Sequence, residues 1–330
     1  MGMLGLYKDE WLQMYNKRQK VNFLSRSSIN YAELDKELKV EIAVLGGLDI
    51  FTNAHVVGVV KNTTMICDAL GLDYETTKKL ILSAYMHDIG KILIPSEVLQ
   101  KNGKLTDEEF EIMKKHTVYG YDICMKYEQF KYLAPIARGH HENLDGSGYP
   151  DGLKGKEIPE EAKLIKIADI YDALTQRRQY KDGFKPSKAV EIILDGVRQG
   201  KTGSKYLYYL LLCVIDDVEE KRQGNIAELE KAEEDLQTLK ELDDIYKRIY
   251  DQGYTKHNEN LLRRYNLSPG YDMTTNTNLL IRTQKKIEVL KEKTKEDKQE
   301  ISTLKKQLKE AKRRIKFSER CVRLFGKFVF

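Results

Sequence analysis

The sequence lacks two features that would assign it to a class at once, paired cysteines and long apolar runs. Its cysteines, Cys67, Cys124, Cys213 and Cys321, are widely scattered and form no C-x-x-C pair. This spacing argues against a disulfide framework or a zinc ribbon and favours reduced thiols in the cytoplasm. No segment approaches the roughly 18 uninterrupted apolar residues of a spanning helix, so we expect no membrane span.

Proline is scarce and strand patterns are missing. Six prolines in 330 residues permit long helices, and no stretch alternates Val, Ile or Thr with polar residues as a strand would. The content of 41% hydrophobic and 32% charged residues fits a soluble protein. We therefore predict an all-α fold. Neither a G-x-S-x-G elbow nor a Cys–His arrangement indicates a protein nucleophile.

Composition divides the chain into three predicted parts. Residues 1–45 form a short helical lead-in, residues 46–215 contain most of the turn residues and all the motifs described below, and residues 216–330 contain two long charged helices. In the middle part, "ETTKKLILSAYMHD" has apolar residues at helical spacing, and "LTDEEFEIMKK" begins with a capping signal. "GFKPSKAV" places Pro186 or Ser187 at the start of a further helix.

The last helix has a heptad seam, which predicts a coiled coil. The seam consists of Ile287, Leu290, Thr294, Asp297, Ile301, Leu304, Leu308, Ala311, Ile315, Ser318, Val322, Phe325 and Val329. The two long helices could form an antiparallel hairpin, or the second could pair with another copy in a homodimer. Residues 279–330 contain 17 Lys or Arg against 7 Asp or Glu. Without interleaved aromatics, this charge favours a solvated coiled-coil flank over a nucleic-acid or membrane surface.

Five of the six histidines lie in the first half of the chain. With two aspartates they form an ordered set: His55, His87, Asp88, His116, His140, His141 and Asp169. Any one of these histidines alone would more often be structural, but side chains from successive helices can converge inside a bundle. Imidazole and carboxylate suit iron, manganese, nickel or zinc. Seven ligands are too many for one ion, so we predict two divalent ions with one bridging carboxylate.

A loop rich in glycine, "HHENLDGSGYPDGLKGKEIP", begins at the paired histidines. Its glycines allow tight turns and a close approach of the backbone to a ligand. Long loops without periodicity are uncommon unless they are functional, so we expect this one to belong to the site.

The order H…HDIGK…H…HHE…DGSGYP…ADIYDALT resembles the HD-GYP family of bacterial phosphodiesterases, a branch of the HD superfamily of metal-dependent phosphohydrolases. The similarity extends from about Asp49 to Leu194. It implies an HD-type helical bundle, followed here by the long-helix extension.

The resemblance also implies a role for each matching position. One metal ion would be held by His55, His87, Asp88 and Asp169, and the second by Asp88, His116, His140 and His141. Lys91, one helical turn beyond His87, would point at the bridging water or a phosphate oxygen. The implied substrate contacts are Lys91, Asp145, Gly146, Tyr149, Arg178 and Lys181. Asp172 would support the site without binding metal. Iron or manganese is expected, with nickel or zinc as alternatives.

The implied activity is hydrolysis of cyclic di-GMP to pGpG, and whether GMP also forms is left open. A mixed cyclic GMP-AMP is an alternative substrate, and a nucleotide-sensing module that signals through the coiled coil is an alternative function. The glycine-rich loop with the letters "DGSGYP" is called the GYP loop below. A diguanylate cyclase with a GGDEF domain is its implied partner.

The sequence departs from the family at several positions. Phe51 stands where some members have a glutamate for a third metal, so two ions are predicted here. Arg177 and Gln179 replace the acidic residue and proline that are usual beside the expected substrate contacts. We expect these changes to affect substrate preference more than metal binding.

Overall fold

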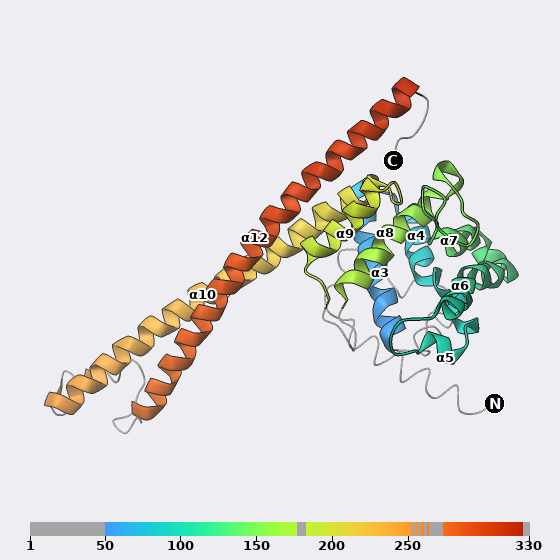
Figure 1. Cartoon of the computed structure of the whole chain (residues 1–330). Coiled ribbons are helices and arrows are strands. Elements are labelled where there is room, and N and C mark those ends of the chain that lie inside the picture. Colours follow the sequence, from blue (N-terminus) through green and yellow to red (C-terminus); the bar gives the residue numbers. More distant parts are fainter. Residues whose placement is uncertain are drawn as a thin grey trace. The chain divides into compact units, whose positions relative to one another are not determined.

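The computed structural model describes residues 50–176, 183–252 and 273–325, together with 255–256, 259–260 and 263. All regular secondary structure in these residues is helical, which confirms the all-α prediction (Figure 1). The α-helices are α3 (Ile50–Leu70), α4 (Tyr74–Met86), α5 (Ser96–Leu99), α6 (Asp107–Lys126), α7 (Ala134–Gly139), α8 (Glu160–Thr175), α9 (Pro186–Arg198), α10 (Ser204–Gln252) and α12 (Met273–Phe325). The 3-10 helices are η2 (Ile89–Leu93), η3 (Glu128–Leu133) and η4 (Gly155–Glu157).

The described residues form two compact units. Those up to Val214, with those from Leu304 onward, form the first unit, and Ile215–Thr303 form the second. The long helices α10 and α12 therefore contribute to both units. Among the described helices, none combines the length and apolar character needed to cross a membrane.

The first unit is a helical bundle. Helix α3 packs against α4 and α8, and α6 packs against η2 and α7. Apolar side chains such as Val59 of α3, Ile165 of α8 and Leu207 of α10 are completely buried. Burial of this apolar surface is the main force that holds successive helices together, and it brings their polar residues to one interior site.

Three helices have clear N-terminal signals, and the sequence predicted those of α6 and α9. Asp73 caps α4, because its side chain accepts a hydrogen bond from the backbone N–H of Thr76 at 3.0 Å. Thr106 and Glu109 form the expected capping box of α6, in which each side chain accepts from the other residue's backbone N–H. Pro186 begins α9, where its missing N–H costs no intrahelical hydrogen bond.

Two glycines allow helices to approach each other beside the candidate ligands. A Cβ at Gly90 in η2 would overlap the carbonyl oxygen of His116 in α6, and one at Gly58 in α3 would overlap the carboxylate of Asp172 in α8. Only glycine fits at these points without a shift of the neighbouring group. The close approach therefore fixes the separation of α6 from η2 and of α3 from α8.

In the second unit, α10 and α12 pair in antiparallel orientation. The amide of Asn276 donates to the carbonyl oxygen of Leu239 at 3.3 Å, and Ile287 and Leu290 of the predicted seam are buried. Asp297, a polar interruption of the seam, accepts hydrogen bonds from Lys221 at 2.9 Å and Asn225 at 2.8 Å. Of the two pairings that the sequence allowed, the structure shows the one within the chain. The coiled-coil supercoil stays a prediction.

Candidate metal centre

The seven residues of the predicted ligand set come from five helices or their ends, α3, α4, α6, α7 and α8. His55 belongs to α3, His116 to α6 and Asp169 to α8. His87 and His140 are the C-terminal caps of α4 and α7, so each lies where a helix stops and its backbone turns. Asp88 and His141 follow them directly in the chain. The bundle places all seven side chains in one region.

Asp88 lies at the middle of this arrangement. Its Oδ1 atom is 3.3 Å from Nε2 of His116 and 3.8 Å from Nε2 of His140, and its Oδ2 atom is 3.2 Å from Nε2 of His87. Two sets of possible ligand atoms, each within 4.8 Å of one another, share this carboxylate. The first set is Asp88, His116, His140 and His141, and the second is His55, His87 and Asp88. Asp169 adjoins the second set, with Oδ1 3.0 Å from Nε2 of His55.

Backbone carbonyls fix the tautomer of three histidines. The Nδ1 atoms of His87, His116 and His140 lie 2.7, 2.7 and 2.9 Å from the carbonyl oxygens of the residues three positions earlier. A carbonyl oxygen can only accept, so each Nδ1 carries the proton and each Nε2 presents its lone pair to the cluster. This arrangement is typical of histidines that bind a metal through Nε2.

His55 is held by a carboxylate. Its Nδ1 atom lies 2.7 Å from Oδ2 of Asp172, on the side of the ring opposite Asp169. Burial lowers the pKa of His55, but the hydrogen bonds to Asp169 and Asp172 outweigh burial and raise the pKa to about 9. A proton is therefore held between two carboxylates at the position where a cation would bind.

Electrostatics keep the remaining ligands in the forms that bind cations. Burial, together with neighbouring imidazoles, lowers the pKa of His140 well below its usual value. Burial lowers the pKa of His141 to about 3. Burial would raise the pKa of Asp88, but the charge of Lys91 and the interaction with His87 outweigh burial and lower that pKa well below its usual value. His140 and His141 are therefore neutral imidazoles beside the ionised carboxylate of Asp88.

Two buried atoms of the cluster have no hydrogen-bond partner in the described part of the chain, Nε2 of His87 and Oδ1 of Asp88. Both residues are at most 2% exposed. Burying such polar atoms without partners is costly, and coordination of a cation would remove the cost. The donor set therefore fits divalent metal ions.

The position of Lys91 requires a correction. We expected Lys91 to share a helix face with His87, but α4 ends at Met86 and Lys91 belongs to η2. At Gly90, η2 lies directly against α6. The Nζ atom of Lys91 contacts Asp88 instead, at 2.6 Å from Oδ2.

The GYP loop lies beside the cluster. The ring of Tyr149 stacks on His141, with centroids 4.8 Å apart and planes inclined by 25°. Gly146 has a φ of 84°, and Oδ1 of Asp145 accepts from the backbone N–H and hydroxyl of Ser147 within the loop. Arg178 and Lys181, the other expected substrate contacts, lie outside the described residues, as do Arg177 and Gln179.

Sequence reasoning missed two residues that hold the loop and the paired histidines in place. The carboxylate of Glu142 accepts hydrogen bonds from the backbone N–H groups of Asp151, Gly152 and Leu153 at 2.7–3.1 Å. The ammonium of Lys166 donates to the carbonyl oxygen of Glu142 and to Oδ1 of Asn143, both at 2.6 Å. Glu142 and Asn143 are visible in the sequence as the last letters of "HHEN". The sequence gives no sign, however, that Glu142 and Lys166 bind backbone atoms.

Imidazole and carboxylate side chains that converge from successive helices define a metal-binding helical bundle. The profile of the HD domain family matches residues 26–205, more than half of the chain, and the chain therefore belongs to this family.

Several curated relatives are phosphodiesterases. The cyclic di-GMP phosphodiesterase of Thermotoga maritima is 32% identical over 272 residues, or 80% of this chain and 66% of the relative. The cyclic di-GMP phosphodiesterase response regulator of Xanthomonas campestris is 41% identical over 44% of this chain and 38% of the relative. The 3'3'-cGAMP-specific phosphodiesterase 1 of Vibrio cholerae is 36% identical over 47% of this chain and 36% of the relative. The chain thus spans from about a third to two thirds of these relatives.

Proposed function

We propose that this protein is a metal-dependent phosphodiesterase that hydrolyses cyclic di-GMP to pGpG and further to GMP. The observation that carries the proposal is the carboxylate of Asp88, which both sets of possible ligand atoms share. A shared carboxylate is suited to bridge two cations. The substrate follows from relatives that are named cyclic di-GMP phosphodiesterases.

The chain offers ligands for two divalent ions. His55, His87, Asp88 and Asp169 would hold one, and Asp88, His116, His140 and His141 the other. This nitrogen and oxygen donor set, without thiolates, suits iron or manganese, with nickel or zinc as alternatives. Two such ions would neutralise phosphodiester charge and lower the pKa of a coordinated water.

Lys91 supplies the charge that the chain itself adds at this site. Its side chain is 22% exposed, whereas the Asp88 side chain beside it is 2% exposed. An anionic phosphate oxygen that approaches from the exposed side therefore meets Lys91. Charge that develops on phosphate oxygens is stabilised by a preorganised cation of this kind.

The loop residues would position the substrate. Tyr149, stacked on His141, presents an aromatic ring next to the cluster. We propose Asp145 and Gly146 as further contacts in the same loop, and Arg178 and Lys181 from the sequence resemblance alone.

Two alternatives stay open to experiment. Hydrolysis of 3'3'-cGAMP is favoured by the similarity to the Vibrio cholerae enzyme of that specificity. A sensing module would bind a cyclic dinucleotide without turnover and signal through the long helices.

The test is an incubation of the anaerobically purified full chain, loaded with Mn²⁺ or Fe²⁺, with cyclic di-GMP or 3'3'-cGAMP. Chromatography should show pGpG from the first substrate at the higher rate. Preferential cleavage of 3'3'-cGAMP would change the assigned substrate but support the assigned phosphodiesterase reaction. Binding of both nucleotides without any product would contradict the proposed phosphodiesterase activity and favour the sensing module.

A matched pair of variants tests the site. Asp88→Asn keeps the size of the side chain but removes the shared negative charge, so metal content and hydrolysis should both be lost. Asp122→Asn, at an exposed position of α6, should change neither. An Asp88→Asn variant that retains its metal and its rate would contradict the assignment.

Further proposals concern organisation and partners. We propose residues 46–215 as the phosphodiesterase domain, with 1–45 as a lead-in and 216–330 as the helical extension. A homodimer through this extension, a GGDEF-domain partner at the GYP loop and a cytoplasmic location are also proposed. Light scattering of the full chain would test the dimer.

A further inference from the structure

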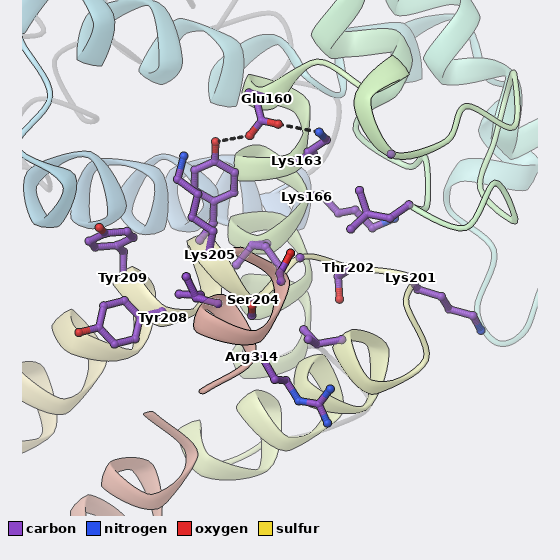
Figure 2. A pocket seen from close by; sticks show the side chains of 18 of the residues that line it. Glu160, Lys163, Lys166, Lys201, Thr202, Ser204, Lys205, Tyr208, Tyr209 and Arg314 are labelled. Carbon is purple, nitrogen blue, oxygen red and sulfur yellow. Dashed lines mark hydrogen bonds and ion pairs between the residues drawn. The ribbon is translucent and has the colours of Figure 1, made fainter. Parts of the chain in front are cut away.

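A cavity in the first unit lies outside the candidate ligand set. It has a volume of about 660 Å³, within the range of small-molecule sites. Its wall is formed by α8, by the start of α10 and by the later part of α12, and none of the seven candidate ligands lines it (Figure 2).

The wall of this cavity is strongly basic. Eight of its lining residues are Lys or Arg and three are Glu. Two of the glutamates are engaged within the protein, because Glu142 accepts from loop amides and Glu160 accepts from Lys163 and Tyr206. Lys205 and Lys312, by contrast, form no ion pair with any residue that the structure describes. The cavity therefore has excess positive charge for an anionic ligand.

The start of α10 adds to this charge. This helix of 49 residues begins at Ser204, and Thr202, Ser204 and Lys205 all line the cavity. The first N–H groups of a helix have no intrahelical partner and bind anions readily. Thr202 is 6% exposed, and its Oγ1 atom has no hydrogen-bond partner in the described chain. A buried hydroxyl without a partner beside a helix N-terminus is suited to a phosphate oxygen.

Aromatic rings complete the lining. Tyr208 and Tyr209 of α10 and Phe317 of α12 line the same cavity, and Phe317 is 57% exposed. Planar rings next to cationic side chains can stack on a nucleobase while the cations contact its phosphates. Neither inorganic phosphate nor an acidic peptide would use both features.

We propose that this cavity is a binding site for a nucleoside polyphosphate, with the phosphates at the start of α10 and the base against the aromatic side chains. The basic groups come from three elements: Lys166 from α8, Lys205 from α10, and Lys312 and Arg314 from α12. Lys166 in this wall also donates to the carbonyl oxygen of Glu142, which directly follows the paired histidines. The same lysine therefore lines the cavity and helps to hold His140 and His141 in place.

The test is isothermal titration of the full chain with GTP, ATP, pyrophosphate and guanosine. The titrations use the full chain with the Asp88→Asn substitution. Binding is then measured without turnover and independently of the proposed hydrolysis. We expect one equivalent of GTP or ATP to bind, pyrophosphate to bind about tenfold more weakly, and guanosine to give no measurable heat. Equal affinity for pyrophosphate and GTP would overturn the nucleotide assignment, and absence of binding by any anion would overturn the site.

Charge-reversal variants locate the binding. Lys205→Glu combined with Lys312→Glu should raise the dissociation constant for GTP by about a hundredfold, roughly tenfold for each lost charge. Thr202→Val, which removes the buried hydroxyl at nearly constant volume, should raise it by a smaller factor. Lys79→Glu, an equally exposed position on α4 outside the cavity, is the control and should have no effect. If the control and the double variant weaken binding equally, the anion binds through general charge and the proposal fails.

Discussion

The Nζ atom of Lys91 lies 2.6 Å from Oδ2 of Asp88, the carboxylate that both sets of candidate metal ligands share. The Lys91 side chain is partly exposed, whereas the Asp88 side chain is buried. The charge of Lys91 is also the largest influence that opposes burial and lowers the pKa of Asp88.

Replacement of Lys91 should separate metal binding from turnover. Lys91→Met keeps most of the side-chain volume but removes the charge, so the variant should retain its metal and lose about 100-fold in kcat, the usual effect of removing one group that stabilises the transition state. Metal analysis and steady-state kinetics with cyclic di-GMP measure the two effects. Lys79→Met is the control. Loss of metal together with rate would show that Lys91 supports the ligands instead of the reaction.

Lys166 should act on the metal centre through the backbone. Its ammonium donates to the carbonyl oxygen of Glu142, directly after the paired histidines. Lys166→Met should therefore lower metal affinity by at least about tenfold, as is typical when a group that orients a ligand is lost. Competition with a metal chelator measures the affinity.

Lys163→Met is the matched control for that experiment. Lys163 belongs to the same helix but pairs with Glu160, away from the histidines. Its replacement should leave metal affinity unchanged. Equal losses in the two variants would indicate general destabilisation of α8 and contradict a specific role for Lys166.

The sequence predicted those parts of the protein that depend on local signals. The capping residues Thr106 and Glu109 act within one turn of their helix, so their spacing is visible in the chain. The seven candidate ligands were recognisable because their residue types recur in order and match a known family. Their convergence in space agrees with that expectation.

The parts that could not be predicted depend on contacts between distant segments. Helix α4 ends before His87, and η2 then lies against α6 at Gly90, a contact between segments that no local pattern shows. Glu142 and Lys166 bind backbone atoms, and backbone partners leave no residue type to recognise. The basic cavity combines residues more than a hundred positions apart, such as Lys205 and Lys312, which no local pattern connects.

The contact of Gly58 with Asp172 gives a prediction for stability. A Cβ at position 58 would overlap the Asp172 carboxylate that binds Nδ1 of His55. Gly58→Ala should therefore lower both the melting temperature and metal affinity, although alanine favours a helix. Thermal unfolding and metal analysis would measure these changes.

Gly224→Ala is the matched control. Gly224 lies in α10 with no atom near the added Cβ, so the same substitution should stabilise the helix by about 0.5–1 kcal/mol. A rise in melting temperature for both variants would show that Asp172 can move without cost, and would contradict its role in holding His55.

The raised pKa of His55 predicts how the metal-free protein responds to pH. Burial lowers this pKa, but the hydrogen bonds to Asp169 and Asp172 raise it to about 9, above the usual 6.5. A raised pKa of a cationic acid means that the folded state binds the proton more tightly than the unfolded state. The resulting stabilisation is fully present below pH 6.5 and is lost as the pH rises through 9.

Metal-free protein should therefore unfold at progressively lower temperature between pH 6.5 and 9, as measured by calorimetry after dialysis against a chelator. His55→Gln, which cannot take up the proton, should show a flatter profile across the same interval. In the metal-loaded protein the dependence should reverse, because a proton and a cation compete for His55 and rising pH favours the cation. A wild-type profile as flat as that of His55→Gln would show that His55 is not held protonated between the two carboxylates.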